Sequence, residues 1–396
     1  MARILLANKF YYPRGGDCTA TLSLEKLLRE KGHDVAIFST HHPLNNSTNW
    51  SNYFPSEIDL SKPKISNLGK AFFRPFFSRE VKKKFTKLLD DFKPDIVHVH
   101  NIHSYQSPYI VKLATSKGIK VFWTLHDYKL LCPAYTCLRN GSPCELCFHS
   151  KHYVLRHKCV KQKMSTSLVA YLEAKLWNRK VLEKYTEKFI CPSFFLQDKM
   201  AQGGFKKEKT VVLHNFFQSI EPPVVTPKNN YYCYVGRLSP EKGVETLLEA
   251  AKQLPYPLKV IGGGDKLAEY QKSFTGSPIE FMGYLAYSEL IPIIQRARFT
   301  VIPSEWYENN PFSVIESLCM GTPVLGSNMG GIPELVEKNV NGYLFEPGNV
   351  EDLKEKIKTC YLRFTDGYNF GKIAVDAQNK FGSESFYNKL MNIYEH

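Results

Sequence analysis

At 396 residues the chain is too long for one ordinary hydrophobic core, and it fits two domains of about 200 residues each. Its 43% hydrophobic and 23% charged residues are typical of a globular protein and exclude a disordered, collagenous or coiled-coil chain. No apolar run approaches the roughly 18 residues that span a bilayer, and the first residues lack the features of a signal peptide. We therefore expect a cytoplasmic protein.

The net charge of +14 is unevenly divided along the chain. Residues 1–220 contain 35 Lys and Arg against 17 Asp and Glu, whereas residues 221–396 contain 17 against 21. The excess of positive charge therefore belongs to the first half. This half is expected to meet a polyanion, such as nucleic acid, acidic lipid or a phosphorylated carrier.

The first half alternates short apolar strands with helical stretches. A helix is expected from about Asp17 to Lys31, with Gly32 as its stop. Strands are expected at residues 3–7, 35–39, 96–100 and 121–125. This alternation predicts an α/β domain with a doubly wound parallel sheet covered on both faces.

A Pro- and Asn-rich stretch without periodicity, residues 221–230, is predicted to link two domains. A second strand–loop–helix series follows, so residues 221–380 are predicted to form another doubly wound domain. Its strands are expected at residues 231–235, 258–261, 299–302 and 323–326. A last helix from Ser383 to Tyr394 lies in a segment, residues 381–396, that could cross back to the first domain.

Two acids and a helix start follow the strand at residues 299–302. The loop ends with Glu308, Asn309, Asn310, Pro311 and Phe312. Either asparagine can cap a helix, and the proline suits its first turn. Glu308 then lies before the helix and Glu316 about a turn and a half inside it. Two carboxylates so placed can reach two hydroxyl-bearing groups of one extended ligand, because carboxylates accept charge-assisted hydrogen bonds.

Three more loops after strands carry ligand-binding chemistry. One presents Arg237 and Lys242, whose charges suit a diphosphate. Another, Gly262-Gly263-Gly264, lets backbone approach a ligand closely. The third, residues 330–334, places two glycines before a proline that suits a helix start, where N–H groups attract phosphate. Each feature alone is common in ordinary packing, but together they predict a ligand site at one sheet edge.

This set of motifs resembles family 4 of the retaining glycosyltransferases. The resemblance rests on Glu308-x7-Glu316, on Gly-Arg-Leu-x-x-Glu-Lys-Gly at 236–243 and on Gly-Gly-Ile-Pro-Glu at 330–334. It covers about residues 230–350 and is looser in the first half, where Gly15-Gly16 and Thr124-Leu125-His126-Asp127 carry it. It implies a GT-B fold, with two Rossmann-like domains facing a central cleft, the first (1–220) binding the acceptor and the second (221–380) the nucleotide sugar.

The resemblance also implies roles for individual residues of the second half. Arg237 and Lys242 would hold the pyrophosphate, Glu308 would touch the donor sugar, and Glu316 would bind the ribose. Donor-binding roles also extend to Gly263, to Tyr284 near the base, and to Asn309, Asn310, Pro311 and Phe312.

In the first half, Gly15 and Gly16 would face the phosphate, and His126 would lie at the sugar. The implied reaction is a retaining, metal-independent transfer from a UDP-sugar to a glycan acceptor, lipid-linked, in bacterial envelope, O-antigen or capsule polysaccharide synthesis. GDP-mannose as donor, and a double displacement with Glu308 as nucleophile, stay open as alternatives.

Five of the ten cysteines fall within residues 132–159. Cys144-x2-Cys147 has the spacing of two zinc ligands, which Cys137 and Cys159 could complete. Three histidines compete for the same role, at positions 149, 152 and 157. Reduced cysteines without a metal are the alternative that a cytosolic protein favours, and disulfides are a third. Zinc here would order a loop and take no part in catalysis.

Residues 68–85 combine five Phe with six cations. Such a segment suits a membrane interface, with rings at the acyl boundary and cations on anionic headgroups. The alternative is an amphipathic helix packed on its own domain, with Lys82–Lys84 solvated. We expect the protein to be peripheral at the cytoplasmic face of an anionic membrane.

Three other protein classes compete with a glycosyltransferase. An NAD(P)-linked oxidoreductase would need Gly-x-Gly-x-x-Gly after the first strand, which residues 8–16 do not provide. Nucleic-acid binding would explain the basic half, yet the aromatic residues do not form a base-stacking pattern, so no nucleic acid is expected. A nonenzymatic nucleotide-sugar-binding protein would keep the donor site without turnover.

Overall fold

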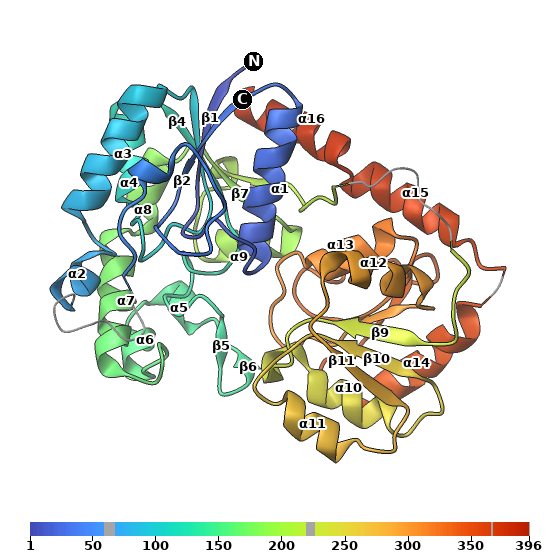
Figure 1. Ribbon diagram of the computed structural model, residues 1–396. Helices are drawn as coiled ribbons and strands as arrows, with labels where there is room; N and C mark the ends of the chain where they lie inside the picture. Colours follow the sequence, from blue (N-terminus) through green and yellow to red (C-terminus); the bar gives the residue numbers. More distant parts are fainter. Residues whose placement is uncertain (59–67, 219–225, 366, 396) are drawn as a thin grey trace. The chain divides into compact units, whose positions relative to one another are not determined.

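The computed structural model describes residues 1–58, 68–218, 226–365 and 367–395 (Figure 1). The chain divides into two compact units. The first contains Met1–Cys137, Cys144–Leu213 and Tyr387–His396, and the second contains Leu138–Pro143 and His214–Phe386. The linker predicted at residues 221–230 begins outside the described residues, which resume at 226.

The first unit is built on six parallel strands in the order β2-β1-β3-β4-β7-β8. They are β1 (Arg3–Ala7), β2 (Asp34–Phe38), β3 (Ile96–Val99), β4 (Lys120–Thr124), β7 (Lys188–Cys191) and β8 (Thr210–Val212). The four strands predicted here are confirmed to within one residue, whereas β7 and β8 were not predicted. The central strands are buried along nearly their whole length, as expected for a parallel sheet covered on both faces.

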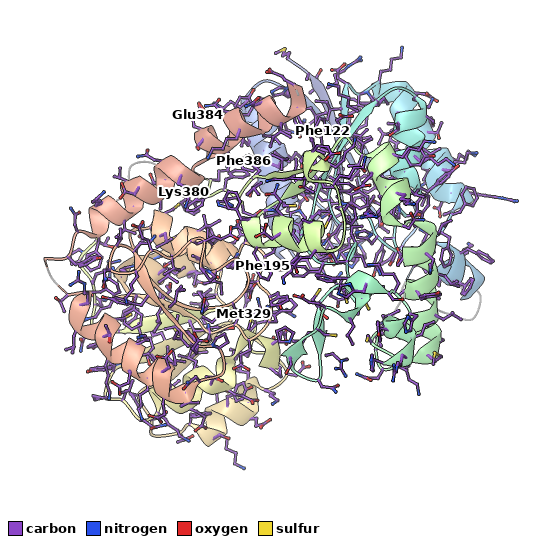
Figure 2. All side chains as sticks on the ribbon, turned by 180° about the vertical axis from the view of Figure 1, so that it is seen from behind. Phe122, Phe195, Met329, Lys380, Glu384 and Phe386 are labelled. Carbon is purple, nitrogen blue, oxygen red and sulfur yellow. The ribbon has the colours of Figure 1, made fainter. Side chains whose placement is uncertain are left out.

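Helices connect these strands. They are α1 (Gly16–Glu30), α2 (Leu68–Phe73), α3 (Arg79–Phe92), α4 (Tyr109–Ser116), α5 (Leu146–His149), α6 (Tyr153–Arg156), α7 (Met164–Leu176), α8 (Arg179–Tyr185) and α9 (Phe194–Gln202), with 3-10 turns η1 (Ser51–Tyr53) and η3 (Lys207–Lys209). The last helix, α16 (Ser383–Glu395), ends in this unit: Tyr394 packs on the buried Phe122, with ring centroids 4.9 Å apart. Phe122 lies among the side chains around the sheet (Figure 2).

The second unit has six parallel strands in the order β11-β10-β9-β12-β13-β14. They are β9 (Tyr232–Val235), β10 (Leu258–Ile261), β11 (Ile279–Gly283), β12 (Thr300–Ile302), β13 (Val324–Ser327) and β14 (Gly342–Phe345). Its helices are α10 (Val244–Ala251), α11 (Leu267–Ser273), α12 (Tyr287–Arg296), α13 (Phe312–Cys319), α14 (Val350–Arg363) and α15 (Phe370–Phe381), with the turn η4 (Pro240–Lys242). A separate antiparallel hairpin joins β5 (Leu138–Arg139) and β6 (Ser142–Pro143).

Two apolar clusters of the second unit show how helices cover both faces of its sheet. One contains residues of α10 and α14, including Leu247 and Ile357. The other contains residues of α12, α13 and α15, including Ile294 and Ile315. The predicted doubly wound α/β class is therefore confirmed.

Strand order places the ligand-binding edge of each sheet. In the second sheet the order reverses between β9 and β12, and in the first between β1 and β3. Loops that leave the carboxyl ends of such neighbouring strands run in opposite directions, which opens a crevice for ligands. The loops after β9 and β12 carry Lys242 and Glu308.

Two glycines bring backbone segments of this edge closer than a side chain would permit. Gly243 has φ +64°, and a Cβ there would lie 1.9 Å from the carbonyl oxygen of Pro303. Gly330 has φ +62°, and a Cβ there would lie 2.3 Å from the carbonyl oxygen of Glu308. Both contacts fix the loop after β12, the first from the β9 side and the second from the β13 side.

We expect Gly330→Ala to destabilise the second unit more than its backbone dihedral alone explains. Gly276 is the matched control, because it has φ +79° but no atom within 4 Å of the point that an alanine Cβ would occupy. Gly276→Ala should cost about 1–2 kcal/mol from the left-handed backbone, and Gly330→Ala roughly 2 kcal/mol more from the clash. Urea unfolding measures both; equal losses would show that Glu308 is not held by this contact.

Candidate functional site

The core of the candidate site is an ion pair between the loops after β9 and β12. Lys242 Nζ lies 2.6 Å from Glu308 Oε1, and the ammonium is 5.1 Å from the centroid of the Trp306 ring. The two loops are also joined by their backbones, because Glu305 N donates to the carbonyl of Glu241 at 3.0 Å. The structure thus brings together two residues that the motifs place 66 positions apart.

Glu308 is held as a carboxylate although it is buried. Its Oε1 accepts hydrogen bonds from Ser304 Oγ at 2.6 Å and from Trp306 Nε1 at 2.9 Å, besides that from Lys242. Burial by itself raises the pKa of Glu308, but the Lys242 charge and the three hydrogen bonds outweigh it, so the net pKa is lowered. The side chain is therefore ionised and fixed before any ligand arrives.

Arg237 lies on the same loop as Lys242 but in a different environment. Its Nη2 is 3.2 Å from Glu241 Oε1, and its side chain is 67% exposed. Tyr234 OH donates to the Arg237 carbonyl at 2.6 Å, which orders the backbone of the loop. An exposed guanidinium in a surface ion pair is weakly held and can move to a phosphate.

The glycine-rich loop after β10 serves two purposes. A Cβ at Gly262 would lie 1.9 Å from Gly236 O, and one at Gly264 would lie 2.4 Å from Leu238 O. These two glycines therefore permit packing against the loop after β9. Gly263 has open space where its Cβ would be, so it is the position of the three at which a ligand could approach the backbone.

Glu316 and Tyr284 belong to two further elements of the second unit, α13 and the loop after β11. Burial raises the pKa of Glu316 to about 7, and a hydrogen bond with Tyr287 of α12 opposes this only in part. The carboxyl occupies the second turn of α13, as predicted. Tyr284 follows β11 and is 89% exposed, which leaves its ring free to stack on a base.

The start of α13 differs from the prediction. Pro311 occupies the cap position, with no side-chain hydrogen bond, and the helix begins at Phe312. Asn310 does not cap the helix, because its Oδ1 accepts from Asn215 N at 2.7 Å and its carbonyl from Asn215 Nδ2 at 2.8 Å. A contact across 95 residues takes precedence over the local cap, and the prediction that Asn309 or Asn310 would cap α13 was wrong.

The Gly330–Glu334 motif does not begin a helix either. Residues 330–335 form turns, and Gly331 N donates to the carbonyl of Glu308 at 2.8 Å. The predicted helix start was therefore wrong. The glycines act through backbone contact with the Glu308 loop, where the sequence pattern had suggested a phosphate-binding helix end.

The first unit positions Gly15 and Gly16 at the start of α1, the first helix after β1. Gly15 is the cap residue and Gly16 the first residue of the helix. Beside them, Asp17 Oδ2 lies 3.6 Å from Lys9 Nζ and accepts a hydrogen bond from Asn101 Nδ2 at 3.1 Å. Burial raises the pKa of Asp17, but the charge of Lys9, the electrostatic influence of nearby His126 and hydrogen bonds lower it overall.

His126 belongs to a column of three histidines that the sequence motifs did not reveal. His126 Nε2 lies 2.8 Å from His100 Nδ1, and the stacked rings of His98 and His100 are 4.6 Å apart. Burial lowers the pKa of His126 to about 4, although Asp17 opposes the shift, so the ring is neutral at pH 7. The sequence did contain a signal for this column, which is the pair of histidines at positions 98 and 100. His98 lies on β3 and His100 directly follows it, and side chains two residues apart share one face of a strand.

The cysteine-rich segment brings together a different set from the one predicted. All ten cysteines are free thiols. Cys132, which was not among the predicted zinc ligands, hydrogen-bonds to Cys137 and Cys147; Cys159 lies near enough to affect the pKa of Cys147. In the described ranges no group of three or more His, Cys, Asp or Glu is arranged to hold a metal ion. Zinc on Cys137, Cys144, Cys147 and Cys159 stays a prediction.

The basic aromatic stretch is partly structural. Phe85 of α3 is fully buried, and Arg74 is buried, where its Nε donates to the carbonyl of Tyr105 at 2.5 Å. Phe72, Phe73 and Phe77 are exposed. The alternative of a helix packed on its own domain therefore applies to α3. At α2 and the turn that follows it, the phenylalanine rings stay exposed. Of the helices within the described ranges, none has the length and apolar character needed to cross a bilayer.

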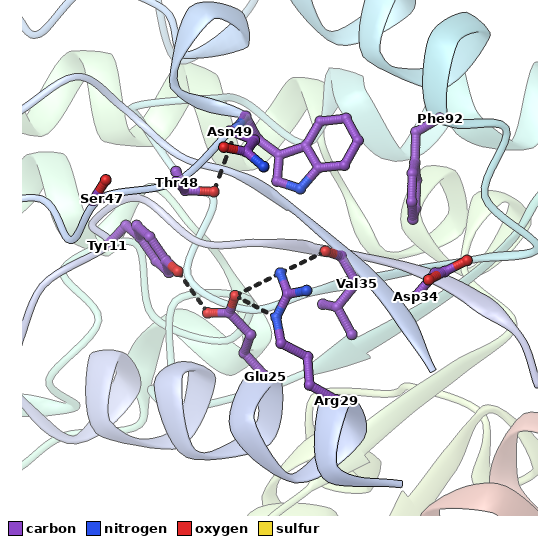
Figure 3. Close-up of a pocket in the computed structure, with 10 residues that line it drawn as sticks. Tyr11, Glu25, Arg29, Asp34, Val35, Ser47, Thr48, Asn49 and Phe92 are labelled. Carbon is purple, nitrogen blue, oxygen red and sulfur yellow. Dashed lines mark hydrogen bonds and ion pairs between the residues drawn. The ribbon is translucent and has the colours of Figure 1, made fainter. Parts of the chain in front are cut away.

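A polar cavity elsewhere in the first unit contains none of the predicted site residues. It is lined by Tyr11, Glu25, Arg29, Asp34, Val35, Ser47, Thr48, Asn49, Trp50 and Phe92 (Figure 3). Glu25 accepts hydrogen bonds from Tyr11 OH at 2.8 Å and from Arg29 Nη2 at 3.0 Å. The hydrogen bonds among Tyr11, Glu25 and Arg29 pair these polar groups with one another. Their presence in the cavity wall is therefore explained by the structure without a ligand.

Known proteins are similar to this chain in both sequence and fold. The profile described as "Glycosyltransferase Family 4" matches residues 15–218, and that of "Glycosyl transferases group 1" matches residues 217–362. An uncharacterized 42.6 kDa protein in the cps region of Klebsiella pneumoniae is 27% identical over 383 residues, which are 89% of this chain and 95% of that protein.

Two solved structures show the same architecture over the whole chain. Sucrose-phosphate synthase from Thermosynechococcus elongatus has a TM-score of 0.72 at 18% identity and covers 100% of this chain and 98% of its own. Anabaena HepE in complex with UDP and glucose has a TM-score of 0.67 at 18% identity, with 100% of both chains covered. The two Rossmann-like units are those of the GT-B fold, and the chain belongs to glycosyltransferase family 4.

Proposed function

We propose that this glycosyltransferase moves a hexose or N-acetylhexosamine from a nucleotide diphosphate sugar, with UDP as the favoured nucleotide, to a lipid-linked glycan acceptor. The proposal places the reaction in cell-envelope or capsule polysaccharide synthesis. The observation that carries it is the Lys242–Glu308 pair at the strand-order reversal of the second sheet. The UDP in the Anabaena HepE structure and the cps region of the Klebsiella relative support the choice of donor and product class.

In the proposed reaction the bond between the anomeric carbon and the pyrophosphate oxygen breaks, and the acceptor hydroxyl oxygen bonds to that carbon. The acceptor proton passes to the leaving phosphate oxygen. Lys242 and the exposed Arg237 neutralise the charge that develops on the diphosphate, which is where preorganised cations lower a barrier most. Glu308 orients the sugar hydroxyls, and Glu316 accepts hydrogen bonds from the ribose.

We further propose that the sugar keeps its anomeric configuration by attack from the face that the phosphate leaves. The alternative is a covalent intermediate on Glu308. Against it, Glu308 Oε1 already accepts hydrogen bonds from Lys242, Ser304 and Trp306, and such an oxygen is a weakened nucleophile. Gly15, Gly16 and His126 of the first unit are assigned to the same reaction, with the neutral His126 as a hydrogen-bonding partner for a sugar hydroxyl.

We expect a UDP-sugar at 100 times its Kd to stabilise the protein against thermal unfolding by about 2.7 kcal/mol, and a GDP-sugar at the same concentration to stabilise it less. A panel of UDP, GDP and their sugars identifies the donor, and transfer of the labelled sugar to an acceptor lipid extract measures turnover. Lys242→Ala should then lower turnover about 100- to 1,000-fold, as loss of one charge-stabilising group does.

Lys266→Ala is the matched control for that variant. Lys266 is also an ion-paired lysine of the second unit, with Glu245, but it lies on the solvent side. Because Lys242→Ala leaves a buried carboxylate without its cation, circular dichroism must show that the variant is folded. Near-normal turnover by folded Lys242→Ala would refute the donor-site assignment.

Glu316 gives a second, independent expectation. A carboxyl whose pKa is raised to about 7 in the folded state binds a proton more tightly folded than unfolded, where its pKa is near 4.5. Its stabilising contribution is therefore present below pH 4.5 and is lost as the pH rises to 7. Glu316→Gln, which cannot ionise, should match the wild type at about pH 4.5 and exceed its stability by about 3 kcal/mol at about pH 8.

Urea unfolding of both proteins across this pH range measures the difference. Glu355→Gln serves as the control, because Glu355 is an exposed acid of α14 whose pKa is lowered by Lys358. A stability difference between Glu316→Gln and wild type that stays constant across the range would contradict a raised pKa of Glu316.

A further inference from the structure

The solvent side of α7 carries an apolar stripe. Met164, Leu168, Leu172 and Leu176 are all exposed and recur every fourth residue, so they follow one another along a single side of the helix. The opposite side, with Ala170 and Glu173, is buried in the first unit. A helix whose buried side is secured would ordinarily present polar residues to water.

A second group of exposed apolar side chains lies next to this stripe. Phe72, Phe73 and Phe77 are 40–62% exposed, and α2 lies beside α7 in Figure 1. Trp177, at the end of α7, donates from Nε1 to the carbonyl of Pro75 at 3.1 Å and thereby fixes the α2 end against α7. We call these seven exposed residues of α2, its following turn and α7 the apolar patch.

The surroundings of the apolar patch are strongly basic. Residues 146–180 contain eight Lys and Arg but a single acid, Glu173. That acid does not oppose the field at the surface, because it is buried and lies 3.0 Å from Lys129 Nζ. Exposed cations stand at both ends of α7 and on α2: Arg156, Lys158, Lys161, Lys163, Lys175, Lys180 and Lys70.

We propose that the apolar patch and its cations dock the first unit on an anionic lipid bilayer, with α7 lying in the plane of the interface. Its 13 residues are too few to span a bilayer. Apolar side chains flanked by cations match the two layers of such a surface, the acyl boundary and the charged headgroups. Docking would bring the first unit to the membrane that contains the proposed lipid-linked acceptor, so it rests on that part of the proposed function. It does not depend on the donor chemistry.

A second copy of the chain fits this surface less well. A twofold contact through the patch would set the same cations of two chains, each of net charge +14, against one another. A lipid surface supplies the opposite charge. Large contiguous apolar patches are rare on soluble monomers unless they meet a partner or a membrane.

Co-sedimentation with vesicles tests the proposal on the whole chain without nucleotide sugar. Wild-type protein should bind vesicles of phosphatidylcholine mixed with phosphatidylglycerol and bind far less to phosphatidylcholine alone. Leu168→Gln/Leu172→Gln should weaken partitioning at least ~10-fold, because two inserted leucines are lost. Replacing Lys158, Lys161 and Lys163 by Gln should weaken it by about fivefold per lysine.

Two matched controls exclude nonspecific effects. Leu44→Gln/Leu362→Gln removes two leucines that are 65% and 72% exposed elsewhere, and should bind like the wild type. Replacing Lys26, Lys206 and Lys207 by Gln changes the net charge equally on exposed sites away from the patch. All variants should retain stabilisation by UDP-sugar, which separates failed docking from a wrong donor assignment.

Three results would overturn the proposal. The first is no binding of wild-type protein to anionic vesicles. The second is binding that Leu168→Gln/Leu172→Gln leaves unchanged. The third is a wild-type dimer in size-exclusion chromatography that the same variant dissociates, which would assign the patch to a second copy of the chain.

Discussion

The candidate donor site depends on a contact between two loops that leave the sheet on either side of a strand-order reversal. Gly243 permits the close approach at Pro303, Glu305 N donates to the carbonyl of Glu241, and Lys242 reaches Glu308 across the gap. A buried carboxylate is costly without its cation. The ion pair and the backbone contacts therefore support each other. The loop conformation brings Lys242 and Glu308 together, and their ion pair stabilises that conformation.

This dependence explains what could be predicted from the sequence. Apolar runs identified eight of the twelve parallel strands that the structure describes, and polar residues after them identified the loops at the ligand-binding edge, because both signals are local. The sequence placed Lys242 and Glu308 at the same sheet edge, whereas the ion pair between them was found only in the structure. The family resemblance added roles that spacing alone does not give.

The failures at Asn310 and Gly330 share a physical cause, which is contact between distant parts of the chain. Asn310 has the composition of a helix cap but is bonded to Asn215, and Gly330 precedes a proline yet packs on Glu308 where a helix was expected. Cys132 was overlooked because Cys144-x2-Cys147 dominates the local pattern. No rule based on neighbouring residues contains the partners of Asn310 and Gly330.

The column of histidines shows how burial changes the chemistry of a familiar side chain. Burial holds the pKa of His98 at about 3 and of His126 at about 4, so neither ring is a cation at pH 7. His98 Nδ1 lies 2.6 Å from Tyr394 OH and its Nε2 lies 2.7 Å from Thr124 Oγ1. His100 stacks on His98 and hydrogen-bonds to His126, so the position of His126 is fixed through His100. A neutral ring held in one orientation is suited to directional hydrogen bonding with a sugar, and unsuited to neutralising a phosphate.

Donor binding does not account for the uneven division of charge along the chain. Residues 221–396, which contain Arg237 and Lys242, have more acids than bases, so the proposed pyrophosphate site needs only local cations. The surplus of the first half includes the exposed lysines and arginines around α7. Charge spread over a surface acts on an extended partner and weakens with distance over a Debye length, whereas a single diphosphate needs two cations at contact. The two proposals therefore use different positive charges, membrane docking the dispersed charge of the first unit and donor binding the two local cations of the second.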